Sequence, residues 1–237
     1  MGRNVGVDGC KTGWIAVTSD DAGLVFAISP TMLGLLDLYP EAEVILVDVP
    51  IGLPWRGCMA RPCDAAARKL LGPRAPSVFS APCRAAAHAP TVARAREMNN
   101  EEVGKSLSAQ AWGICKKIAE VDALLLGDAH ARTVIREMHP EVCFFALNGA
   151  KPMANAKRTI AGQAERLELL SRYEPGSTAL LQAFRATTLR KHAQTDDLLD
   201  ALVGHVTALK RPQPIAVAAG SATRDALDLP IKMVCAS

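Results

Sequence analysis

The sequence is poor in aromatic residues and contains no long apolar run. Phenylalanine, tryptophan and tyrosine make up 4% of its 237 residues, and no apolar segment approaches the ~18 residues that a bilayer-spanning helix needs. The first residues enter a strand-like segment directly, without the charged and then apolar layout of a signal peptide. These absences predict a cytoplasmic protein that does not bind a membrane.

An excess of charge of one sign is also missing. Lysine and arginine total 27 against 24 aspartates and glutamates, a net charge of +3, which excludes an acidic solvating tail and a histone-like cation. Any basic surface must therefore be local. The hydrophobic fraction of 49% is typical of a globular protein with a full core.

The sequence has no Cys-x-x-Cys pair. Its seven cysteines are an odd number in a chain without export signals, which argues against a disulfide framework. Cys58 and Cys63 enclose four residues instead of the two of a zinc knuckle. We therefore expect reduced thiols and no structural zinc.

Three stretches near the N-terminus alternate apolar and polar residues with the period of β-strands. They cover residues 4–8, 14–18 and 24–28, and the segments between them carry the Gly, Asp and Ser residues of hairpin turns. An unbroken apolar run at 44–47 indicates a strand covered on both faces. Residues 133–138 indicate a further strand.

Capping residues and three-to-four periodicity predict the helices. Thr31 and Thr195 each stand where a helix would begin. The expected helices are 31–38, 106–126, 140–149, 157–170 and 195–209. A polar stretch follows residue 170. The order of elements predicts an α/β fold, a mixed sheet of three antiparallel hairpin strands plus parallel strands with helices on both faces. We expect a single domain, 1–237, with a helical, proline-rich insertion at about 54–105.

Acidic residues stand at the ends of the predicted buried strands. Asp8 closes the first strand and Asp48 ends the apolar run. Ligands collect beyond the carboxyl ends of strands in open α/β sheets, and a lone buried carboxylate costs several kcal/mol unless it is paired, protonated or bound to a cation. Asp8 and Asp48 are therefore candidate site residues.

The last predicted helix and the end of the strand at 133–138 add further acids. Asp197 and Asp200 are three residues apart and so share a helix face, although first-turn acids such as Asp197 also offset the helix dipole. Glu137 lies at the end of this strand, and His139 and Glu141 follow it. The alternative interpretation of the last two is a near-cap histidine and an acid that offsets the helix dipole.

Carboxylates without matching histidines or thiolates suit Mg²⁺ or Mn²⁺ better than zinc. Two such ions can hold the attacking water and the leaving oxygen of a phosphodiester. The predicted metal ligands are Asp8, Asp48, Asp197 and Asp200, and Glu137 joins them as a predicted catalytic residue. Asp8 is the candidate bridging ligand.

At these residues the sequence resembles the family grouped as domain of unknown function 429, described as predicted RNase H-like nucleases. The motifs that carry the resemblance are Val5-Gly6-Val7-Asp8-Gly9-Cys10-Lys11 through Trp14, Val47-Asp48-Val49-Pro50-Ile51-Gly52-Leu53-Pro54, Glu137-Met138-His139-Pro140-Glu141 and Asp196-Asp197-Leu198-Leu199-Asp200-Ala201. The resemblance implies an RNase H-like fold. It extends to the Holliday-junction resolvase branch, whose acids come from the first strand, the fourth strand and the last helix.

The segment after Asp48 is rich in arginines, which could bind phosphates, with Phe79 as a stacking surface. A solvated, proline-stiffened excursion with Phe79 packed inward is the alternative. The predicted substrate-binding residues are Lys11, Arg74, Ser77, Arg84 and His139.

The leading functional prediction is a Mg²⁺- or Mn²⁺-dependent nuclease acting on DNA or RNA. The sequence leaves the oligomeric state open, with a homodimer as one option. A noncatalytic RNase H-like module that binds nucleic acid or protein is the alternative, with the acids serving structure. A third interpretation takes Asp8 to Gly13 as an actin-like phosphate loop for ATP, although the chain has residues for only one of the two domains that such proteins close around ATP.

Overall fold

A computed structural model describes residues 3–236 and divides the chain into two compact units. Of these residues, the first unit comprises 3–48, 133–213 and 234–236, and the second comprises 49–132 and 214–233. The predicted insertion, about 54–105, lies within the second unit.

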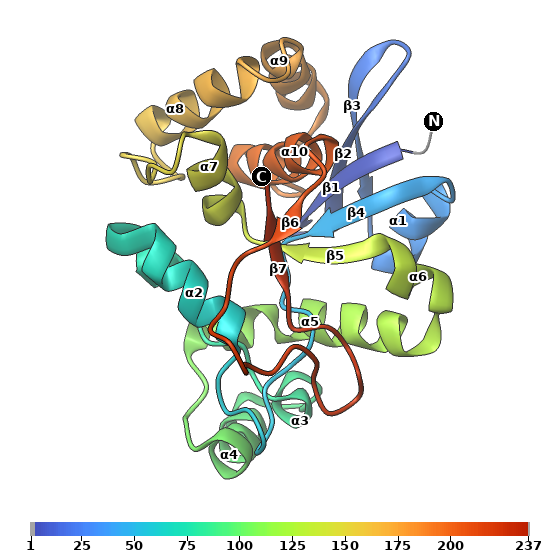
Figure 1. Ribbon diagram of the computed structural model, residues 1–237. Helices are drawn as coiled ribbons and strands as arrows, with labels where there is room; N and C mark the ends of the chain where they lie inside the picture. The colour runs from blue at the N-terminus through green and yellow to red at the C-terminus, as the bar shows by residue number, and fades with distance from the viewer. Residues whose placement is uncertain (1–2, 237) are drawn as a thin grey trace. The chain divides into compact units, whose positions relative to one another are not determined.

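The first unit is built on the N-terminal strands (Figure 1). β1 (Arg3–Cys10), β2 (Gly13–Asp20) and β3 (Gly23–Ser29) form two antiparallel hairpins, while β4 (Ala42–Val47) pairs in parallel with β1 and with β5 (Ile135–Met138). Two short strands, β6 (Gln213–Pro214) and β7 (Met233–Cys235), complete the order β3-β2-β1-β4-β5-β7-β6. The predicted mixed sheet is confirmed, and it is compatible with an RNase H-like fold.

Helix α10 (Thr195–Leu209) packs on β1 at a close backbone contact (Figure 1). A Cβ atom added to Gly6 would lie 2.1 Å from the Ala201 carbonyl oxygen and 2.1 Å from the His205 nitrogen. Gly204 faces Gly6 from the helix, where its own added Cβ would lie 3.0 Å from the Gly6 Cα. Two glycines thus allow the helix to approach the strand and fix which face of β1 it covers.

Strand alternation assigns the two faces of this sheet. The apolar cluster around α10 includes Ile15, Val17, Leu46 and Met138. The residues that alternate with these four along each strand therefore point to the other face of the sheet. Helix α1 (Met32–Leu38) contacts β2 and β3, and Thr31 caps it by accepting a hydrogen bond from the Gly34 amide.

The remaining helices of the first unit are α7 (Pro140–Leu147), α8 (Ile160–Ser171) and α9 (Ser177–Thr187). Three sequence predictions need correction here. Thr159 caps α8, so residues 157–159 precede the helix. The stretch after residue 170 contains α9, which buries Leu180, Leu181 and Phe184. α10 is capped by Gln194, not Thr195, through a capping box with Asp197.

The second unit is mainly helical. It contains α2 (Pro62–Leu71), the 3₁₀ helix η1 (Gly72–Ser77), α3 (Arg84–Ala87), α4 (Val92–Val103) and α5 (Ala109–Gly127), with Pro62 in the first turn of α2. The predicted helix at 106–126 is present as α5, but Ser108 caps it, so residues 106–108 precede the helix. α6 (Ala129–Val134) leads into β5, so this strand begins at Ile135 and not at 133.

A buried ion-pair network holds the segment 214–233 within the second unit. Arg84 donates to both carboxylate oxygens of Asp122, at 2.8 and 2.9 Å, and to Asp225 at 2.6 Å. Asp225 also accepts hydrogen bonds from the Leu53 and Leu229 amides. Its carboxylate therefore joins three separate parts of the second unit.

Candidate metal centre

Asp8 lies on the α10 face of the first unit. It follows Gly6 by two residues on β1, so its side chain emerges on the same face as the glycine that contacts α10. The residue is 8% exposed, and its Oδ1 accepts a hydrogen bond from the Gly9 amide at 2.7 Å. The first strand thus carries a nearly buried carboxylate to the edge of the α10 core.

Asp48 continues the parallel ladder beside Asp8. Its amide donates to the Val7 carbonyl oxygen at 3.1 Å, which extends the pairing of β4 with β1 by one residue. Asp48 comes two residues after Leu46, a member of the α10 cluster. Adjacent parallel strands therefore end in neighbouring acids, as the sequence predicts.

Asp200 comes from α10 and is 1% exposed. The Lys157 ammonium donates to its Oδ2 at 2.5 Å, from a side chain that is 38% exposed. Asp197 plays a different part, because its Oδ2 accepts the Gln194 amide at 2.8 Å in the capping box. The predicted pair on one helix face is thus divided between the ion pair and the helix cap.

Asp8, Asp48 and Asp200, the aspartate cluster, interact electrostatically. Burial raises the pKa of Asp8 well above its ordinary value, and the negative charges of Asp48 and Asp200 raise it further. Burial likewise raises the pKa of Asp200 to about 6 against the opposing charge of Lys157, while Asp48 adds to the rise. Asp200 in turn raises the pKa of Lys157, so this ammonium is a firm cation.

Burial also raises the pKa of Asp48, whereas His139 and Lys157 lower it. His139 precedes α7 as its N-cap residue and is partly buried. The structure therefore brings His139, predicted from the sequence to bind substrate, into the electrostatic surroundings of the cluster.

Glu141 follows in the first turn of α7 and forms an ion pair with Arg166 of α8, a side chain that is 1% exposed. The Arg166 guanidinium lies 5.2 Å from the Phe144 ring centroid. Glu141 raises the pKa of Asp48 and of Asp200. Its own charge is matched by Arg166, whereas Lys157 acts on all three aspartates and His139 on Asp48 alone.

The donor chemistry of the aspartate cluster fits a hard divalent cation. Its ligands are carboxylate oxygens, which Mg²⁺ and Mn²⁺ prefer, and burial, the main cause of their raised pKa values, makes the ionised forms costly without a cation. Within residues 3–236, however, Asp8, Asp48 and Asp200 do not offer three oxygens that all lie within 4.8 Å of one another. Joint ligation therefore requires side-chain rotation, including release of Asp200 by Lys157.

A basic groove of about 880 Å³ lies in the first unit beside the start of α10. Arg158, Arg185 and Arg190 line it, together with Asp196. Arg158 lies 3.5 Å from Asp196, and no ion pair of Arg185 or Arg190 is found among the described residues. Since Lys157 and Arg158 are consecutive, one loop serves both the aspartate cluster and the groove.

A family model described as "Protein of unknown function (DUF429)" matches residues 6–224. The chain belongs to this family. No curated protein and no solved structure matches the chain. The matched range includes the whole aspartate cluster and all residues of the basic groove, so both are features of this chain's DUF429 region. Membership of the DUF429 family, predicted from the sequence, is confirmed, while the relation to RNase H-like nucleases and to the resolvase branch stays a prediction.

Glu137 does not share the face of the aspartate cluster. It pairs in register with Val47, which itself pairs with Val7, whereas the α10 face carries Gly6 and Leu46. Residues paired across strands point to the same side of a sheet. The structure therefore places the buried Glu137 side chain on the opposite face of the sheet.

The predicted substrate-binding residues fall into two groups. Lys11 is exposed in the turn between β1 and β2 of the first unit. Arg74, Ser77 and Arg84 belong to the second unit, where the Ser77 hydroxyl donates to the Arg74 carbonyl oxygen at 2.8 Å and Arg84 is held by Asp122 and Asp225. Ser77 and Arg84 thus have evident structural roles.

In the hairpin from Asp8 to Gly13, packing against the end of β3 explains why position 13 is a glycine. Gly13 has a φ of +141°, and an added Cβ would lie 2.1 Å from the Ser29 carbonyl oxygen. The glycine is required by the end of β3, so it gives no support to an actin-like phosphate loop.

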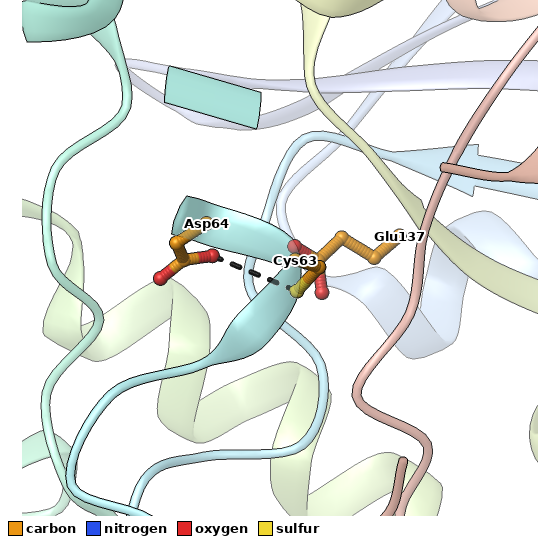
Figure 2. A group of neighbouring side chains, drawn as sticks. All are labelled: Cys63, Asp64 and Glu137. Carbon is orange, nitrogen blue, oxygen red and sulfur yellow. Dashed lines mark hydrogen bonds between the residues drawn. The ribbon is translucent and has the colours of Figure 1, made fainter. Parts of the chain in front are cut away.

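Cys63 and Asp64 lie in the first turn of α2, in the second unit. The Cys63 thiol donates to Asp64 Oδ1 across 3.7 Å (Figure 2), and Arg61 Nη1 donates to the same oxygen at 3.0 Å. Glu137, the third side chain drawn, belongs to β5 of the first unit. Asp64 therefore has its counter-charge within the second unit.

No helix described for residues 3–236 has both the length and the apolar composition needed to cross a membrane.

Proposed function

We propose that the chain is a Mg²⁺- or Mn²⁺-dependent nuclease that hydrolyses phosphodiester bonds of DNA or RNA, with an RNase H-like architecture of the resolvase kind. The observation that carries the proposal is the aspartate cluster, in which burial raises the pKa of all three carboxyls and neighbouring aspartates raise those of Asp8 and Asp200 further. Perturbed carboxyl groups of this kind gather at functional sites. A cytoplasmic location is part of the same proposal.

Asp8, Asp48 and Asp200 would hold the cation, which when bound would supply Lewis acidity to the phosphodiester. Lys157 has a separate task. Its side chain is 38% exposed, so its ammonium can turn from Asp200 to a phosphate oxygen of the substrate. Asp197 keeps the start of α10 in place through the Gln194 amide.

The basic groove supports a nucleic-acid substrate. Arg158, Arg185 and Arg190 present three guanidinium groups against the single carboxylate of Asp196. Each phosphate contact contributes about 0.9 to the slope of log K against log salt for B-DNA. We expect each Arg→Gln substitution at Arg185 or Arg190 to lower the slope by about 0.9.

The decisive assay measures cleavage of single-stranded, duplex and branched DNA and RNA in Mg²⁺, in Mn²⁺ and in EDTA. We expect metal-dependent cleavage by the native chain and by Asp37→Asn, a control that removes an exposed carboxylate of α1. Asp8→Asn should reduce cleavage to background. Equal activity of Asp8→Asn and the native chain would refute the proposal.

The Lys157–Asp200 pair also suits the noncatalytic module, because Asp200 already has a counter-charge. Isothermal titration with Mn²⁺ separates the two functions. Saturable binding that Asp8→Asn abolishes supports the nuclease, and carboxylate-independent binding or none supports the module.

A further inference from the structure

The second unit contains a cavity of about 340 Å³, within the roughly 300–1,000 Å³ range of small-molecule pockets. Its walls come from α2, from residues 78–81, from the end of α4 and from the segment that enters α5. All of these lie in the second unit, whereas the aspartate cluster belongs to the first.

The ionisable side chains that line the cavity carry net positive charge. They are Arg61, Asp64, Arg68 and Lys105. Arg61 and Asp64 neutralise each other through an ion pair of 3.0 Å. Arg68 and Lys105 then leave the cavity with two positive charges, which favours an anionic ligand.

Arg68 is held in a fixed orientation. Its Nε donates to the Val78 carbonyl oxygen at 2.8 Å, and its Nη2 donates to the Ser80 hydroxyl at 3.3 Å. A guanidinium has five N–H donors, so donors remain for a ligand. A planar, oriented fork of this kind matches the geometry of a phosphate.

Further donors stand at the entrance of α5. Lys105, Ser106 and Ser108 line the cavity and are exposed. Ser108 Oγ accepts the Ala111 amide at 3.1 Å, so its own hydroxyl hydrogen can be donated elsewhere. An ammonium and two hydroxyl groups thus accompany Arg68.

An apolar wall completes the cavity. Val78, Val103 and Leu107 are buried in it, while Phe79 is half-buried and lines the same space. A phenylalanine ring can stack on a nucleobase. The cavity therefore combines phosphate donors with an aromatic surface, the two features that a nucleotide engages together.

We propose that this cavity binds a nucleoside monophosphate. Arg68, Lys105 and Ser106 hold the phosphate, and Phe79 contacts the base. The site needs no metal and is independent of the proposed nuclease activity.

Isothermal titration of the full-length protein in EDTA tests this assignment. The probes are AMP, GMP, CMP and UMP, with adenosine and inorganic phosphate as arms that lack one half of the ligand. We expect saturable binding of one equivalent of at least one nucleotide, with adenosine and phosphate each binding at least tenfold more weakly. Saturable binding of none of the four would overturn the proposal, and phosphate binding as tightly as the nucleotides would overturn the base contact.

Variants then locate the binding. We expect Lys105→Gln to weaken nucleotide affinity roughly tenfold and Phe79→Leu to weaken it while sparing inorganic phosphate. Lys69→Gln is the matched control, since Lys69 is an exposed lysine of α2 that does not line the cavity. Asp8→Asn should bind as the native chain does. An equal effect of the two lysine variants would refute the site, whatever the nuclease assay shows.

Discussion

Replacing Asp200 with asparagine should stabilise the first unit at pH 8 in the absence of divalent ions. The folded-state pKa of Asp200 is raised, so the folded protein binds more protons than the unfolded chain between about pH 4 and pH 6, and stability falls as the pH rises through this window. The interval from 3.8 to about 6 corresponds to about 3 kcal/mol, at 1.36 kcal/mol per pH unit. Asparagine carries no charge and avoids this cost.

Urea unfolding followed by tryptophan fluorescence measures the effect. Trp14 is the one tryptophan of the first unit, so a Trp55→Phe, Trp112→Phe background reports on that unit alone. We expect Asp200→Asn to raise the free energy of unfolding by about 3 kcal/mol at pH 8 and to approach the parent protein near pH 4.

Asp37→Asn, which removes an exposed charge, should change the free energy of unfolding by at most about 0.5 kcal/mol. The noncatalytic module predicts the opposite result for Asp200→Asn, a lower free energy of unfolding, because in that case the ion pair with Lys157 stabilises the fold. A loss of stability in Asp200→Asn at pH 8 would therefore refute the reasoning from repulsion.

Three further predictions concern the first unit. Gly6→Ala should destabilise it by at least about 2 kcal/mol in urea unfolding, because the added Cβ meets the Ala201 backbone at 2.1 Å; unchanged stability would contradict the close contact. Arg166→Met should cost about 3–5 kcal/mol at pH 7 by leaving Glu141 buried without its cation, which thermal unfolding would show. Burial raises the pKa of Cys143 to about 12, so a thiol reagent at pH 8 should label it only after unfolding, and rapid labelling of the native protein would contradict this.

The parts of the fold that sequence reasoning predicted are those encoded locally. The hairpins of β1, β2 and β3 follow from period-two alternation and turn residues, which need no distant partner. Asp8 and Asp48 were found for the same reason, since each comes directly at the end of a recognisable strand. Their proximity followed from the rule that adjacent parallel strands end at one edge.

The parts that escaped prediction depend on tertiary contacts. Lys157 reaches Asp200 across 43 positions of sequence, from residues that no helical period marks. The face of Glu137 depends on the register of β5 against β4, and a slip of one residue would reverse it. Helix α9 was missed because its polar residues obscured the buried face of Leu180, Leu181 and Phe184.

Charge balance separates the aspartate cluster from Glu141, another buried acid of the first unit. Glu141 has Arg166 to itself, as expected of a structural ion pair. Lys157, joined by His139 at Asp48, offsets only part of the cost of burying Asp8, Asp48 and Asp200, so their raised pKa values reflect burial first and a deficit of positive charge second. Protons can fill this deficit at low pH and a divalent cation can fill it at neutral pH, so the two must compete for the same oxygens. Removing one of these carboxylates lowers the cost of burying charge, so the presence of all three in one cluster supports a role in binding a cation.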